Sequence, residues 1–258
     1  MDSETRGRLR GSFDHAAAGY AASRPGYPDE AVDWLLGAGA HDVVDLGAGS
    51  GSLTRPLTLR ARRVVAAEPS RNLLTELRAE AGVVPAIQTS AELLPFAGET
   101  FDVVTVATAF HWFDAERALP EIARVLRPGG HLALVWNTRA LTTSWTQELD
   151  DLLRSAQPST LQGDWGTGSV HALDGSALFD PPEYAVFEHE QRATREGLVG
   201  LVASRSYVIS LDPPDRDSLL DRVAALFDAH AVQDGTLGLP YRAECWRAAV
   251  RRPPHPAP

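Results

Sequence analysis

The sequence predicts an α/β fold with a doubly wound, mostly parallel sheet, helices on both faces and a partial helical lid. Through the first half of the chain, short runs of β-branched residues alternate with longer stretches of helical period, which is typical of parallel strands joined by helical crossovers. A glycine-rich turn directly follows the first of these runs. After about residue 137 the alternation gives way to longer helical stretches, and this change predicts the lid.

Five strands are expected in the first half of the chain, at residues 43–44, 64–66, 83–87, 101–107 and 131–136. Crossovers between parallel neighbours are right-handed as a rule, so the intervening helices cover both faces of the sheet. Ligands of such sheets bind beyond the carboxyl ends of the strands, where the strand order reverses. A binding site is therefore expected at that edge.

The helix before the fifth strand has an apolar face formed by Ala118, Leu119, Ile122, Val125 and Leu126. Arg124 and Arg127 fall near its carboxyl end, where the helix dipole favours cations. The run Pro-Gly-Gly at residues 128–130 then ends the helix.

The chain is expected to divide into four segments: an N-terminal helical lid segment at residues 1–40, a ligand-binding core at 41–137, a lid insertion with sheet-completing strands at 138–250, and a disordered tail at 251–258. The tail contains four prolines in eight residues, which permit neither a helix nor a central strand. The insertion should contain helices at residues 142–155 and 218–230 and strands at 184–189 and 239–246.

Charge and composition exclude several classes of partner. The formal net charge of −10 and the pI near 5.2 oppose nonspecific attraction to nucleic acid or to an anionic membrane. The one cysteine, Cys245, cannot form an intramolecular disulfide, which favours a reducing, cytoplasmic location. No apolar run approaches the roughly 20 residues of a membrane span, and no His or Cys spacing indicates a metal site. The oligomeric state is left open.

A glycine-rich loop is the strongest sequence signal for a binding site. Residues 45–51 read DLGAGSG, directly after a predicted strand and before a predicted helix, as expected of a Rossmann-like fold. Glycines allow a tight turn and a close approach of the backbone to a ligand. The dinucleotide pattern G-x-G-x-x-G is incomplete, because Ser52 stands where its last glycine belongs. This departure disfavours an NAD-dependent oxidoreductase.

Glu68 follows the second expected strand, 21 residues after Gly47. A carboxylate at this place can accept hydrogen bonds from both ribose hydroxyls of a nucleoside that lies across the sheet edge. The alternative is an exposed acid at a strand end that faces solvent.

The chain resembles the class I S-adenosylmethionine-dependent methyltransferases over nearly its whole length, most clearly from about residue 42 to 137. Four blocks carry the resemblance: VVDLGAGSG, VVAAEPS, SAELLPF, and FDVVTVATAFHWFD followed by ARVLRPGGHLALV. Within that family it is similar to the type 11 branch, and its FDHAAAGYAASRPGYP and HWF segments are similar to trans-aconitate methyltransferase-like proteins. The resemblance implies in-line methyl transfer from S-adenosylmethionine to a small organic acceptor. The alternative is a protein that retains the cofactor as a structural or electrostatic ligand without methylating.

The resemblance also implies a cofactor site that contains Gly47, Ala48, Gly49, Glu68, Pro69, Ala91, Glu92 and Ala107. The three loop residues would line the methionine and ribose, and Glu68 would hold the ribose hydroxyls. Pro69 would flank the adenine, which Ala91 and Glu92 would reach. Ala107 would border the sulfonium. For Glu92 the alternative is a helix-capping acid.

Asp45, at the start of the loop motif, has two roles open to it. It would fix the loop or accept a hydrogen bond from the methionine amino group, or it would only cap loop amides. Upstream of the first strand, Tyr20 and Arg24 could close over the methionine carboxylate, because a guanidinium matches the planar carboxylate. The alternative is a surface arginine beside a packing tyrosine.

His111 is the candidate catalytic residue and lies with Trp112 just after the fourth expected strand, where the acceptor must meet the sulfonium. With an ordinary pKa near about 6.5, a histidine there could remove a proton from the acceptor. A role in shaping the cofactor pocket is equally open. Trp112 and Arg205 are the candidate acceptor-binding residues, with Arg205 pairing with a carboxylate; the alternative for Arg205 is an arginine on a helix surface.

Overall fold

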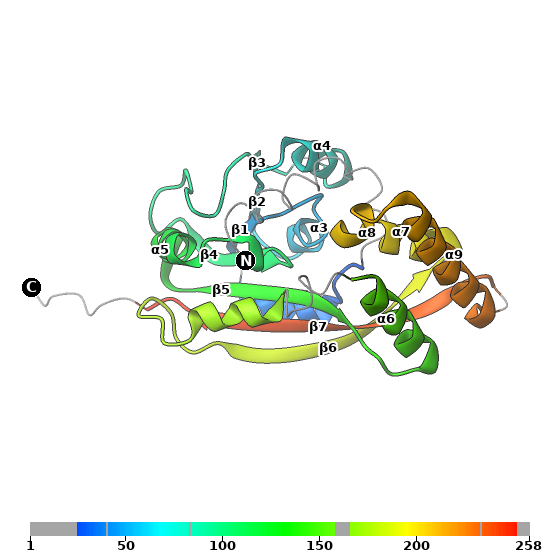
Figure 1. Cartoon of the computed structure of the whole chain (residues 1–258). Coiled ribbons are helices and arrows are strands. Elements are labelled where there is room, and N and C mark those ends of the chain that lie inside the picture. Colours follow the sequence, from blue (N-terminus) through cyan, green and yellow to red (C-terminus); the bar gives the residue numbers. More distant parts are fainter. Residues whose placement is uncertain (1–24, 40, 83, 158–165, 233, 252–258) are drawn as a thin grey trace, which may run out of the picture. The chain divides into compact units, whose positions relative to one another are not determined.

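The computed structural model describes residues 25–39, 41–82, 84–157, 166–232 and 234–251. Within these residues the chain forms two compact units (Figure 1). We call one the sheet unit, which comprises Tyr27–Asn137 with residues 166–187 and 243–251. The other, the helical unit, contains residues 138–157, 188–232 and 234–242. Each is described on its own.

Seven strands form one sheet in the order β3-β2-β1-β4-β5-β7-β6. They are β1 (Asp42–Leu46), β2 (Arg63–Ala67), β3 (Ala86–Ile87), β4 (Phe101–Ala107), β5 (Leu126–Arg139), β6 (Glu183–Ala193) and β7 (Leu237–Ala249). The pairs β1 with β2, β1 with β4, β2 with β3 and β4 with β5 are parallel. The predicted α/β fold with a mostly parallel sheet is confirmed, and the two late strands complete it as expected.

Apolar residues on both faces of the central strands explain why the sheet is covered twice. All five residues of β1 are buried, which is typical of a strand with helices on both faces. Val44 and Val104 lie in one core cluster with the apolar face of α5 (Ala115–Val125). Their neighbours Val43 and Val103 lie in the opposite cluster with α2 (Asp29–Leu36) and α3 (Thr54–Thr58). The alternation follows from the two-residue period of a strand.

Several predicted boundaries differ from those of the structure, and two of the differences have a clear physical cause. The helix expected to run to Arg127 ends at Val125, because Leu126 is extended and pairs with Phe101 as the first residue of β5. Proline disfavours helical dihedral angles in the residue that precedes it, and Arg127 precedes Pro128. The third strand is restricted to Ala86–Ile87, since the preceding Pro85 has no N–H to donate to a ladder.

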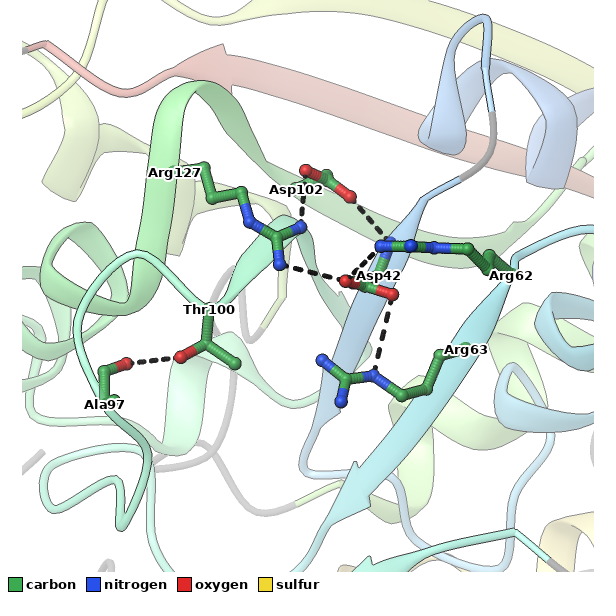
Figure 2. Close-up of polar contacts among 7 residues, drawn as sticks. All are labelled: Asp42, Arg62, Arg63, Ala97, Thr100, Asp102 and Arg127. Carbon is green, nitrogen blue, oxygen red and sulfur yellow. Dashed lines mark hydrogen bonds and ion pairs between the residues drawn. The ribbon is translucent and has the colours of Figure 1, made fainter.

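An ion-pair network joins the amino-terminal ends of four parallel strands (Figure 2). Asp42 accepts hydrogen bonds from Arg62 and from Arg127 Nη2 at 2.9 Å, and lies 3.6 Å from Arg63 Nε. Asp102 accepts from the Asp42 amide at 2.7 Å and from Arg127 Nη1 at 2.8 Å. Partial burial raises the pKa of Asp102, but the Asp42 amide and the Arg127 guanidinium together hold it below its ordinary value. The network therefore lies at the edge opposite to the glycine-rich loop.

The helical unit has its own apolar core. It contains α6 (Ser144–Ala156), α7 (Arg195–Ala203), α8 (Ser206–Ile209) and α9 (Pro213–His230), and α7 packs on α9, drawn in gold and orange in Figure 1. The two helices expected at residues 142–155 and 218–230 are present as α6 and α9. Helix α9 begins earlier than predicted, at Pro213, because proline is favoured in the first turn, where its missing N–H has no partner in any case.

Not every element of the expected lid insertion belongs to the helical unit. Phe179 is 1% exposed and lies in the core of the sheet unit, as does the short 3-10 helix η3 (Thr167–Leu173) through Val170 and Leu173. Helix α2, within the segment expected as an N-terminal lid, also packs against this sheet. None of the described helices is both long and apolar enough to cross a membrane.

Candidate cofactor-binding site

The glycine-rich loop begins at the carboxyl end of β1 and depends on left-handed backbone conformations. Gly47, Gly49 and Gly51 have φ angles of +64°, +57° and +91°, which L-amino acids with side chains rarely adopt. The Gly47 amide donates to the Ala67 carbonyl at 2.8 Å, so the loop is fixed to the end of β2. The sequence motif thus forms the tight turn that it predicted.

The three glycines are required for different reasons. A Cβ atom on Gly47 would lie 2.6 Å from Ala109 Cβ, and one on Gly51 would lie 3.3 Å from Leu77 Cγ. These two glycines allow close packing. A Cβ on Gly49 would meet no heavy atom within 4 Å, so the backbone of Gly49 faces open space. This is the position at which a ligand could approach the loop.

Glu68 is fixed against this loop. Its Oε2 accepts the Gly49 amide at 2.9 Å, and its Oε1 accepts the Ser70 amide at 2.9 Å. The residue is 6% exposed, so the alternative of a solvent-facing acid is wrong. A carboxylate can accept more hydrogen bonds than these two amides donate, so the arrangement is compatible with hydroxyl donors from a ligand.

Asp45 lies behind the loop and is fully buried. Thr54 Oγ1, at the start of α3, donates to one carboxylate oxygen at 2.6 Å, and Thr105 Oγ1, on β4, donates to the other at 2.9 Å. Among the described residues no loop amide donates to it. Burial raises the pKa of Asp45 to about 6, although the two hydroxyl hydrogen bonds oppose this rise.

This pKa predicts how stability should depend on pH. Because the folded pKa of about 6 lies above the ordinary value of 3.8 for an aspartate, the folded state binds the proton more tightly, and stability should fall as the pH rises between these values. The difference amounts to at most about 3 kcal/mol at neutral pH. We therefore expect Asp45→Asn to gain stability relative to the wild type by up to that amount between pH 4 and pH 7. Urea unfolding of both proteins at both pH values measures this, and a constant gap would contradict it.

The residues expected around the adenine lie near the ends of β2 and β3. Ala91 is buried, and the Pro69 carbonyl accepts the Gln88 side-chain amide at 3.0 Å. Glu92 Oε1 accepts the Asp114 backbone amide at 3.0 Å, at the amino-terminal end of α5. This contact is the helix-capping role that the sequence left open for Glu92. Contact of these residues with adenine stays a prediction.

The end of β4 contains a strained residue that the sequence does not reveal. Thr108, directly after Ala107, has a φ of 52°, which is an outlier for a β-branched side chain. Its amide donates to the Val135 carbonyl at 2.8 Å, and its Oγ1 lies 3.2 Å from the Tyr27 hydroxyl oxygen. No sequence pattern marks a threonine for positive φ, whereas Tyr27 lies inside the N-terminal block that carries the family resemblance.

His111 and Trp112 lie in the short 3-10 helix η1 (Phe110–Trp112) that follows this strand. Their ring centroids are 4.8 Å apart and the rings are tilted by 46°. Trp112 packs against the core cluster that contains α5. The turn therefore holds both side chains close in sequence and space to the end of β4, where Ala107 is the last strand residue.

The predicted site residues do not all fall in one unit. The loop residues, Glu68 and the residues after β3 and β4 belong to the sheet unit. Arg205 belongs to the helical unit. Tyr20 and Arg24 lie outside the described residues.

Comparison with known proteins assigns the chain to a family. A model of the methyltransferase domain matches residues 44–134. Uncharacterized methyltransferases of Mycobacterium bovis and Mycobacterium tuberculosis are 40% identical over 93% of this chain and 96% of theirs. A methyltransferase-like protein of Schizosaccharomyces pombe is 32% identical over 83% of this chain and 86% of its own. A solved structure from Anaeromyxobacter dehalogenans, assigned as a type II methyltransferase, has a TM-score of 0.68 at 25% identity and covers 90% of this chain and 99% of its own. The chain is therefore a member of the class I S-adenosylmethionine-dependent methyltransferases.

Proposed function

We propose that this enzyme transfers the methyl group of S-adenosylmethionine to a small organic acceptor by in-line displacement, and that the cofactor binds at the glycine-rich loop. The contact between Glu68 and the Gly49 amide carries the proposal. It places a buried carboxylate beside a backbone segment that faces open space. A nucleoside needs both features, since its ribose offers two hydroxyl donors and its bulk requires a loop without side chains.

The residues present fit this cofactor. Gly47, Ala48 and Gly49 would hold its methionine and ribose, and Glu68 the ribose hydroxyls. Pro69, Ala91 and Glu92 would contact the adenine, and Ala107 would lie beside the sulfonium. S-adenosylmethionine supplies an already activated methyl group, so the chain mainly has to bind and orient the two reactants. His111 would accept a proton from the acceptor at one of its ring nitrogens.

The acceptor is proposed to be small, as in the type 11 branch and the trans-aconitate methyltransferase-like proteins that the chain resembles. The net charge of −10 supports this choice, because a nucleic acid would be repelled. Trp112 and Arg205 would contact the acceptor. The single cysteine, Cys245, is buried, and this burial raises the pKa of its thiol to about 12. Because one cysteine cannot form an intramolecular disulfide, a cytoplasmic location is proposed.

Calorimetry tests the cofactor assignment directly. S-adenosylmethionine and S-adenosylhomocysteine should both bind saturably, whereas NAD should show no saturable binding. Release of S-adenosylhomocysteine in the presence of a panel of small acceptors then separates a methyltransferase from a protein that only retains the cofactor. Tight binding of NAD with no binding of either sulfur compound would refute the proposal.

Replacing Glu68 with alanine should weaken S-adenosylhomocysteine binding by about 1.5–3 kcal/mol, the range for hydrogen bonds to a charged group. Because Glu68 also holds the Gly49 amide, the unfolding midpoint of the variant must be measured with the affinity. Glu80→Ala, which removes an exposed acid at the end of α4 (Arg71–Glu80), is the matched control. An unchanged affinity for Glu68→Ala would show that the ribose is held elsewhere.

A further inference from the structure

Two arginines of the helical unit lie close enough to repel each other. Arg139 is the last residue of β5, and Arg205 lies between α7 and α8. Burial, and after it the positive charge of Arg205, lower the pKa of Arg139 to about 10. The guanidinium of Arg139 is therefore still protonated at neutral pH. Like charges brought together at a site with little solvent are unfavourable unless something of opposite charge accompanies them.

The described residues provide little of that opposite charge. Asp150 on α6 accepts Arg139 Nη2 at 3.1 Å, but the same carboxylate also accepts Arg154 Nε. One acid is thus shared by two arginines. The guanidinium of Arg205 forms no hydrogen bond or ion pair with any residue in the described ranges. Among these four side chains, three arginines thus face one carboxylate.

Two donors of this pair are also buried without an acceptor. The Nε atoms of Arg139 and Arg205 have no hydrogen-bond partner within the described part of the chain. A buried N–H that has lost water and gained no acceptor destabilises the folded state. Tyr207 and Tyr241, both buried, lie near enough to affect the charge of Arg139, and Tyr241 stacks on His189 with ring centroids 5.6 Å apart. Arg139 therefore lies beside tyrosine rings rather than in open solvent.

From this arrangement we infer that Arg139 and Arg205 together bind an oxyanion group of the acceptor, a carboxylate or a phosphate. That this anion belongs to the acceptor rests on the proposed function. A guanidinium presents two parallel N–H groups that match the oxygens of either anion. Two guanidinium groups favour a doubly charged acceptor over a singly charged one. The anion would supply both the missing acceptors and the missing negative charge.

Calorimetry with succinate and with inorganic phosphate as probes tests this site in the full chain. Wild-type protein should bind one or both probes saturably at constant ionic strength, and whichever binds identifies the anion class. Arg139→Gln and Arg205→Gln should each weaken that binding about ten- to a hundredfold, the effect of losing charge-assisted hydrogen bonds. Arg195→Gln is the matched control, because Arg195 lies in the same unit and is already paired with Asp228. The control should bind the probes as the wild type does.

Two further measurements separate this site from a structural role and from the cofactor. Without probe, the unfolding midpoint of Arg205→Gln should equal or exceed that of the wild type, since the variant removes an unpaired positive charge. The probe affinity should be the same with and without saturating S-adenosylhomocysteine. The inference is overturned if neither probe binds, if the control loses binding equally, or if S-adenosylhomocysteine displaces the probe. A wild type that binds the probes but not S-adenosylhomocysteine would refute the proposed function and leave the anion site standing.

Discussion

Replacing Gly49 with valine is expected to abolish binding of S-adenosylhomocysteine while the protein stays folded. A Cβ atom at this position would meet no heavy atom within 4 Å, so the valine side chain would extend into the space that the proposed cofactor needs. The positive φ of +57° adds local strain of about 1–3 kcal/mol for a β-branched residue. Calorimetry measures the binding, and far-UV circular dichroism with a thermal melt measures the fold.

Gly129→Val is the matched control for this variant. Gly129 has a φ of +81° and also faces open space, but it lies at the amino-terminal end of β5, away from the loop. The control should show similar strain and unchanged binding. If Gly49→Val bound S-adenosylhomocysteine normally, or if the control lost binding to the same degree, the loop would not be the cofactor site.

Gly47→Ala should behave differently from a change at Gly49. Its Cβ would lie 2.6 Å from Ala109 Cβ, so the loop or the end of β4 must move, and stability should fall by about 1–3 kcal/mol. The comparison distinguishes a glycine needed for packing from one needed for a ligand.

His111→Gln is expected to lower turnover by about 100- to 10,000-fold, the usual scale for the loss of a general base. The affinity for S-adenosylhomocysteine should change little, because the proposed role of His111 concerns the proton of the acceptor. Steady-state kinetics with an active acceptor measure the turnover, and calorimetry on the same preparation measures the affinity for S-adenosylhomocysteine.

His171→Gln is the control, since His171 is an exposed histidine that hydrogen-bonds to Asp174. It should retain full activity. A parallel fall in affinity and turnover for His111→Gln would assign His111 to the cofactor pocket instead. Unchanged turnover would remove it from the reaction altogether.

The central sheet could be predicted because its strands are buried on both faces and read as short β-branched runs. The limits of single elements could not, since they depend on partners distant in the chain. Leu126 fits the apolar stripe of α5 as well as it fits β5, and its pairing with Phe101 on β4 determines that it belongs to the strand. Similarly, a short strand such as β3 exists only because β2 offers it an edge.

The candidate site could be predicted where chemistry requires a particular residue type at a particular spacing. Glycines after β1 and an acid after β2 meet that condition, and the loop geometry and the burial of Glu68 agree with it. The strained Thr108 and the proximity of the like-charged Arg139 and Arg205 could not be foreseen. Both arise from segments that meet only in the folded chain, and neither leaves a pattern in the local sequence.

The ion-pair network of Figure 2 has a consequence for how this enzyme could evolve. It fastens the strands at their amino-terminal ends through Asp42, Asp102 and Arg127, and none of these residues belongs to the proposed site. Substitutions in the loops at the opposite edge therefore leave these bonds intact. Substitutions in those loops can therefore change the acceptor while the sheet keeps this ion-pair network. This property suits the fold to laboratory selection for new methylation targets.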